Sequence, residues 1–204
     1  MNLTVELIPK TCHGSNVRTL IPKKYWERLR KKSYEDANHQ CEICGQKGKD
    51  QGYKHDLECH EIWSYTTETG VQKLEGLISL CPLCHLCKHI GRALAMRKSK
   101  VAFDHMKAIN NITDEYLAVY LDIVFAEHKE LSKLKWTLDL SILNEEHDVE
   151  LPLLEKAHKQ RLDENTKPPK KKKYYRKKRV KKKPVGVKKV IGKRPKKKKR
   201  PTKK

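Results

Sequence analysis

The sequence has no apolar run long enough to cross a membrane. Its longest apolar stretch, residues 117–126, is interrupted by Asp122, whereas a membrane-spanning helix needs about 20 predominantly apolar residues. The chain also begins without the basic and apolar segments of a secretory leader. We therefore expect a soluble protein with no membrane partner. Its expected location is the reducing interior of the cell: cytoplasm, nucleoid or, in a eukaryote, nucleus.

Acidic residues are missing from the end of the chain. Residues 167–204 hold 23 of the 47 Lys and Arg residues and no Asp or Glu, so the net charge of +22 comes almost entirely from this tail. Such a block repels itself and has few apolar side chains to bury, which predicts disorder until a polyanion binds. The expected partner is DNA, with RNA as the alternative. A nuclear-localisation signal is another interpretation of such runs.

The residues expected to contact nucleic acid lie in the first basic cluster of the tail. They are Lys170, Lys171, Lys172, Lys173, Arg176, Lys177, Lys178 and Arg179.

Four of the seven cysteines form two Cys-x2-Cys pairs, Cys41 with Cys44 and Cys81 with Cys84. In a reducing compartment such pairs indicate metal ligands rather than disulfides. Four thiolates match the tetrahedral coordination of structural zinc. Gly45 directly follows the first pair and permits the tight turn of a knuckle. The sequence therefore predicts a structural Zn²⁺ on these four cysteines.

Three histidines fall inside the loop that this zinc would close. His85 and His89 are four residues apart in a predicted helix over 82–95, so they share one face. His60 lies in the first strand of a predicted hairpin, formed by residues 57–65 and 71–74. Three imidazoles predict a second metal site, suited to Zn²⁺, Ni²⁺, Mn²⁺ or Fe²⁺ better than to Mg²⁺.

The segments Leu57-Glu-Cys-His-Glu-Ile62 and Gly76-Leu-Ile-Ser-Leu-Cys-Pro-Leu-Cys-His85-x3-His89 resemble the HNH endonucleases of the ββα-metal (His-Me finger) class. The resemblance covers about residues 38–92. It implies a catalytic divalent metal (Mg²⁺, Mn²⁺, Ni²⁺ or Zn²⁺) and hydrolysis of phosphodiester bonds. It also implies roles for individual residues: His60, His85 and His89 as ligands of the catalytic metal, Glu61 as general base, and Gly76 in the position of the family's Asn.

Glu61 and Gly76 depart from the family, which has His and Asn there. A carboxylate is an effective base near neutral pH only where a site of low polarity raises its pKa. Three alternatives follow. A register shifted by one residue makes Cys59 the ligand and His60 the base, although strand alternation turns Cys59 to the side opposite His60. Glu61 could be a fourth ligand, which would make the metal structural, and His55 could replace it as base.

Together these patterns predict an α+β fold: a ββα-metal finger braced by a four-cysteine zinc knuckle, with flanking helices and a disordered basic tail. The expected parts are 1–37 (arm and helix), 38–95 (HNH module), 96–166 (helical extension) and 167–204 (tail). Residues 1–21 are expected to form a surface or lightly packed arm. The predicted amphipathic helix over 114–135 would pack in the core or form a dimer seam.

Two functions agree with the sequence. The first is a metal-dependent HNH-type DNA endonuclease tethered to DNA by its polybasic tail. The second is a non-catalytic, zinc-containing nucleic-acid-binding protein built on a degenerate HNH finger.

Overall fold

The structure is a computed structural model that describes residues 1–13, 16–145, 147–150, 152–156 and 159. The expected tail, with its predicted nucleic-acid contacts, lies outside the described residues. The fold class is α+β, as predicted. The described elements are η1 (Lys10–Cys12), α1 (Val17–Leu20), α2 (Lys23–Asp36), η2 (Lys49–Gln51), β1 (Glu58–Thr66), β2 (Val71–Leu80), α3 (Pro82–Lys88), α4 (Ile90–Ala95), α5 (Ser99–Asn110), α6 (Asp114–Leu131), β3 (Thr137–Asp139) and α7 (Ser141–Glu145).

The sheet is the predicted hairpin with one strand added. β1 pairs antiparallel with β2, and β3 pairs parallel with β2. Gly70 has a φ of +67° in the turn between β1 and β2, a conformation that glycine adopts at low cost. The second strand was expected to end at Leu74 but continues to Leu80. A bulge lets it do so, because the register shifts where Ile62 pairs with Gly76 and Trp63 pairs with Leu74.

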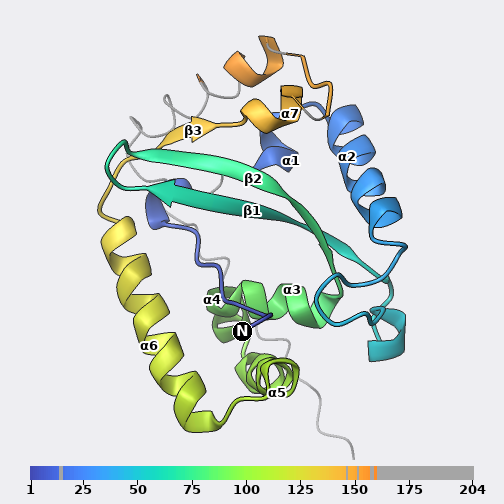
Figure 1. Cartoon of the computed structure of the whole chain (residues 1–204), viewed down its shortest axis with the longest axis vertical. Helices are drawn as coiled ribbons and strands as arrows, with labels where there is room; N and C mark the ends of the chain where they lie inside the picture. Colours follow the sequence, from blue (N-terminus) through green and yellow to red (C-terminus); the bar gives the residue numbers. More distant parts are fainter. Residues whose placement is uncertain (14–15, 146, 151, 157–158, 160–204) are drawn as a thin grey trace, which may run out of the picture. The chain divides into compact units, whose positions relative to one another are not determined.

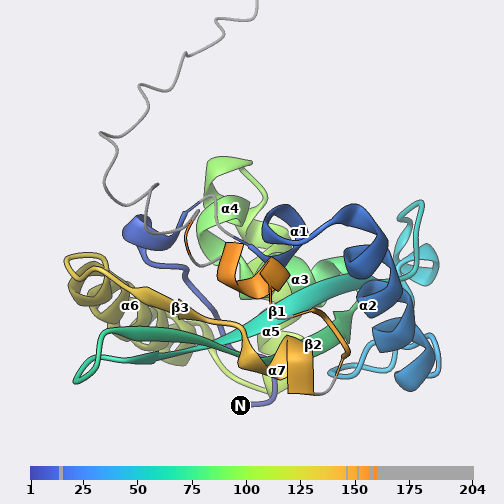
Figure 2. The same cartoon turned by 90° about the horizontal axis from the view of Figure 1, so that it is seen from above.

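The hairpin separates two hydrophobic cores, and it runs between two groups of helices in Figure 1. On one side, buried residues of α3 to α6 pack with Leu80 of β2 and with the N-terminal segment. On the other side, buried residues of α1, α2 and α7 pack with Leu74 of β2. Figure 2 shows the same hairpin from above. Side chains alternate along a strand, and the bulge between Leu74 and Gly76 reverses this alternation, so that Leu74 and Leu80 lie in different cores.

The helices confirm most of the predicted elements. α2 begins directly after Pro22, and α6 begins after Thr113, whose side chain accepts a hydrogen bond from the backbone N–H of Tyr116 at 3.2 Å. The single helix expected over 82–95 is instead two short helices that meet at His89, where φ is −100° and ψ is 52°. Among the described residues, none of the helices combines the length and the apolar character that crossing a membrane requires.

Part of the N-terminal segment is buried, so the expected surface arm was wrong at Leu3 and Val5. Leu3 and Val5 belong to the first core. The side chain of Asn110 in α5 accepts a hydrogen bond from the backbone N–H of Leu3 at 3.0 Å and donates one to its carbonyl at 2.8 Å. The Tyr120 hydroxyl of α6 accepts from the N–H of Val5 at 2.8 Å. These contacts fix an extended segment against the helices.

Candidate functional site

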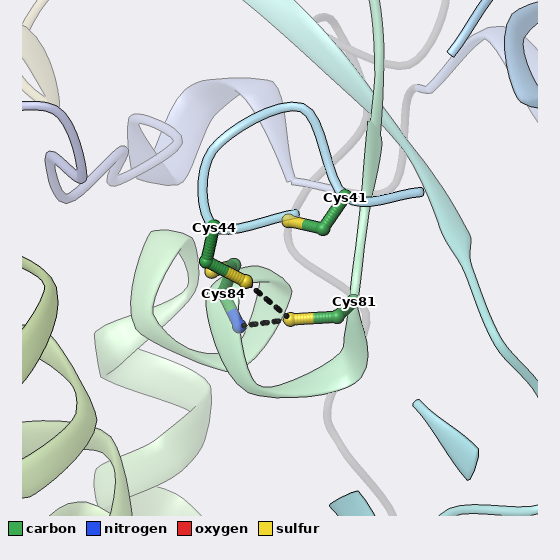
Figure 3. A group of neighbouring side chains, drawn as sticks. All are labelled: Cys41, Cys44, Cys81 and Cys84. Atoms are coloured by element: carbon green, nitrogen blue, oxygen red, sulfur yellow. Dashed lines mark hydrogen bonds between the residues drawn. The ribbon is translucent and has the colours of Figure 1, made fainter. Parts of the chain in front are cut away.

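The two Cys-x2-Cys pairs come together, as the sequence predicts (Figure 3). Cys41 and Cys44 lie in the loop after α2, and Cys81 and Cys84 lie at the start of α3. All four Sγ atoms are within 4.8 Å of one another, and those of Cys44 and Cys81 are 3.6 Å apart. Tetrahedral zinc with Zn–S bonds of about 2.3 Å requires sulfurs about 3.8 Å apart. The cluster therefore fits a structural metal such as zinc.

Local backbone geometry builds this cluster. Gly45 has a φ of +72°, and its N–H donates to the carbonyl of Cys41 at 2.7 Å, which closes the turn between the first two ligands. Cys81 is the N-cap of α3, where its Sγ accepts from the N–H of Cys84 at 3.4 Å. Gly48 is needed for close approach, because a Cβ there would lie 2.1 Å from the carbonyl oxygen of His55.

The pKa values of the cysteine thiols in this cluster shift in opposite directions. Hydrogen bonds from Cys81 and Cys84 hold the pKa of Cys41 far below its usual range. Burial raises the pKa of Cys44 to about 12, and the hydrogen bond with Cys41 raises that of Cys84. Without a cation, full ionisation of such a cluster is unfavourable, so binding of a metal would release protons.

Three histidine rings converge on the α3 side of the hairpin. His60 comes from β1, His85 from α3, and His89 from the junction of α3 and α4. One ring nitrogen of each lies within 4.8 Å of the others. The ring centroids are 4.6 Å apart for His85 and His89, 4.8 Å for His60 and His89, and 5.3 Å for His60 and His85. Three imidazole nitrogens at these separations could hold a metal ion.

Burial keeps two of these imidazoles in the form that binds metals. The side chain of His60 is only 2% exposed, and burial lowers its pKa. Burial, followed by the neighbouring charges of His85 and His60, lowers the pKa of His89 to about 3. Both rings are therefore neutral near pH 7 and can offer a nitrogen lone pair.

Two carboxylates that sequence analysis did not place in the site hold these histidines. Glu58 of β1 hydrogen-bonds Nδ1 of His85, and this contact lowers the pKa of Glu58 to about 2. Its other oxygen lies 2.9 Å from Nε2 of His55. Glu6 of the N-terminal segment lies 2.7 Å from Nε2 of His60. Glu58 carried a local signal, since it is two residues from His60 on the same strand face, but Glu6 carried none.

Glu61 points away from the histidines. It follows His60 on β1, so it faces the opposite side of the hairpin. There its carboxylate accepts hydrogen bonds from the N–H of Val17 at 2.8 Å and from Nε1 of Trp63 at 3.2 Å. Burial raises its pKa to about 7. This position does not support the predicted role of Glu61 as general base beside the metal, nor the alternative role of fourth ligand.

Two other residues, Cys59 and Gly76, entered the comparison with the HNH pattern. Cys59 packs against the second core, on the side opposite His60, as strand alternation predicts. A register with Cys59 as metal ligand is therefore not supported. Gly76 pairs with Ile62 at the bulge of the hairpin.

Comparison of the chain with protein-family models, with curated proteins and with solved structures gave no match.

Proposed function

We propose that this chain is a metal-dependent endonuclease of HNH type that hydrolyses phosphodiester bonds in DNA. The observation that carries the proposal is the convergence of three imidazole nitrogens within 4.8 Å, next to a separate four-cysteine cluster. A structural zinc uses four protein ligands, whereas a catalytic metal commonly has three and keeps positions for water or substrate. The two clusters differ in this way.

In this proposal the histidines of the site bind a divalent ion. The bound ion supplies positive charge for a phosphoryl oxygen and for the leaving 3′ oxygen. His60 anchors the ion from the strand, while His85 and His89 hold it from the helical side. The zinc on the four cysteines fixes the start of α3, and thereby the position of His85, which directly follows Cys84.

The general base in this proposal is His55 instead of Glu61. The side chain of His55 is about half exposed, at 51%, so water and substrate can reach it. Glu58 links it to the metal site, because one carboxylate oxygen contacts His55 and the other contacts His85. Histidine is the most common general base in enzymes, and a carboxylate partner orients its ring.

The polybasic tail provides the affinity for nucleic acid. Contacts between its Lys and Arg side chains and backbone phosphates are independent of sequence and weaken steeply with salt. We propose DNA as the substrate, and structured RNA is the alternative substrate.

The test is cleavage of supercoiled plasmid at low salt with Mg²⁺, Mn²⁺, Ni²⁺ and Zn²⁺ in turn. We expect nicked or linear plasmid with at least one ion and a loss of activity of 100-fold or more, as an order of magnitude, in His85→Ala and His55→Ala. His39→Asn is the matched control, because His39 is exposed and has a φ of +55°, which asparagine tolerates. A chain that cleaves neither plasmid nor structured RNA with any ion refutes the proposal.

The second candidate is a non-catalytic nucleic-acid-binding protein. The position of Glu61 on the far side of the hairpin favours it, because the residue at the family's base position then lies away from the three rings. This candidate predicts salt-dependent binding of DNA without cleavage and a purely structural effect of His85→Ala.

A further inference from the structure

The N-terminal segment brings a carboxylate to the three-histidine cluster. Glu6 Oε2 lies 2.7 Å from His60 Nε2, across 54 residues of sequence. The backbone N–H of Glu6 also donates to the carbonyl of Lys88 at 2.8 Å, which anchors this residue to the end of α3. The side chain of Glu6 is 24% exposed, and that of His60 is 2% exposed, so the contact is largely shielded from water.

A buried cation lies on the other side of the same carboxylate. Lys88 is only 6% exposed. Its ammonium group donates to Glu6 Oε1 and, at 3.1 Å, to the hydroxyl of Thr4. The two carboxylate oxygens of Glu6 thus contact a lysine on one side and a histidine on the other.

The geometry points to Glu6 as a positioning residue of the three-histidine metal site. This inference rests on the second metal site proposed above. Because Nε2 of His60 faces Glu6, Nδ1 is the nitrogen left for a metal. On the second ring, Glu58 holds Nδ1 of His85 and leaves Nε2. Metal-bound histidines commonly donate their other N–H to a carboxylate, which fixes the ring and increases its basicity.

The negative charge of Glu6 also offsets the positive charge of Lys88 near the histidines. The ammonium group of Lys88 contacts the same carboxylate that contacts His60, and it would repel a divalent cation bound to His60, because like charges in a shielded environment repel. Glu6 lies between Lys88 and His60 and offsets this repulsion. Loss of its charge should therefore weaken the metal site in two ways, by freeing the His60 ring and by exposing the metal to Lys88.

The experiment measures binding of Co²⁺ to the zinc-loaded full chain by visible absorption and by titration calorimetry. The variants are Glu6→Gln, Lys88→Met and the double variant. Glu75→Gln is the matched control, because Glu75 lies on β2 in an exposed ion pair with Lys73. Retention of the first zinc and the circular dichroism spectrum report whether each variant is folded.

We expect Glu6→Gln to weaken Co²⁺ binding by about 10-fold to 100-fold, and Glu75→Gln to leave it unchanged. Lys88→Met should bind Co²⁺ as tightly as the parent chain or more tightly. The double variant should lose less affinity than Glu6→Gln alone, because the uncompensated ammonium group has gone. A purely structural role predicts otherwise, namely lower thermal stability in both single variants without a selective loss of Co²⁺ affinity.

The outcomes separate the two proposals. If folded Glu6→Gln binds Co²⁺ like the parent chain, or if Lys88→Met weakens binding as much as Glu6→Gln does, the role of Glu6 is overturned and the nuclease proposal stands. If Glu6 controls Co²⁺ affinity but no nucleic acid is cleaved, the nuclease proposal falls and the role of Glu6 stands. A parent chain that binds no second metal overturns both.

Discussion

Replacing Glu61 by glutamine tests whether this residue is a buried structural carboxyl or a catalytic base. In the folded chain burial raises its pKa to about 7, whereas a glutamate in an unfolded chain has a pKa of about 4.3. Between these values the unfolded state releases a proton that the folded state retains. The free energy of unfolding should therefore fall as the pH rises through this window, and Glu61→Gln should remove that fall.

The size of the effect follows from the two pKa values. Each pKa unit corresponds to about 1.4 kcal/mol, so the full displacement amounts to roughly 3 to 4 kcal/mol. The stabilisation that comes from the raised pKa of Glu61 is fully present below about pH 4.3, the pKa of the unfolded state. It is fully lost above about pH 7, the pKa of the folded state. Between pH 5 and pH 8, roughly 2 to 3 kcal/mol of this loss should be observed in the parent chain and not in Glu61→Gln.

The measurement is urea denaturation of both chains at pH 5 and pH 8, in their zinc-loaded form. Only the difference in pH dependence carries the test, because glutamine also changes the hydrogen bonds to Val17 and Trp63. Glu68→Gln, an exposed carboxylate in the turn of the hairpin, should behave like the parent chain. The reasoning is refuted if Glu61→Gln keeps the pH dependence of the parent, and a selective loss of cleavage at unchanged stability would restore Glu61 as a base.

Three further changes give separate predictions. Cys81→Ser removes one of four thiolates, so the content of tightly held zinc measured by atomic emission should fall and the chain should unfold at lower temperature; unchanged zinc content would exclude the cluster as its site. Leu74→Ala opens a cavity in the second core and should lower the urea-measured free energy of unfolding by about 2 to 5 kcal/mol, and a change below 1 kcal/mol, the order of one buried methylene, would contradict that packing. Deleting residues 167–204 should flatten the plot of log affinity against log salt for plasmid DNA by up to about 7, if eight phosphate contacts are lost. An unchanged slope would place the nucleic-acid contacts elsewhere.

The sequence predicted which cysteines and which histidines come together, because their signals are local. A Cys-x2-Cys pair and a histidine pair four residues apart each specify a geometry that follows from a turn or a helix. The gathering of Cys41 with Cys81, and of His60 with His85, was then inferred from chemistry, since lone ligands rarely occur in such patterns. The helix predicted over residues 114–135 followed from hydrophobic periodicity, and it is present as α6, which ends at Leu131.

The prediction for Glu61 failed although the rule that corrects it was already in use. Alternation along the strand was applied to Cys59, which was expected on the side opposite His60 and lies there. The same rule puts Glu61, the other neighbour of His60, on that side as well. The resemblance to HNH endonucleases made Glu61 the base because of its position in the motif. Its position on β1, however, turns its side chain to the side of the hairpin opposite the histidines.

The contact between Glu6 and His60 could not be predicted from local sequence patterns. Glu6 reaches His60 only because the N-terminal segment is held against α5 and α6 by contacts that span more than 100 residues of sequence. No periodicity within residues 1–9 indicates such a partner. Adjacent helix residues differ by about 100° in direction, so a metal on Cys84 would fix the α3 orientation that aims His85 at the other two rings. The four-cysteine cluster thus controls the position of His85, while the distant N-terminal segment contacts and orients His60.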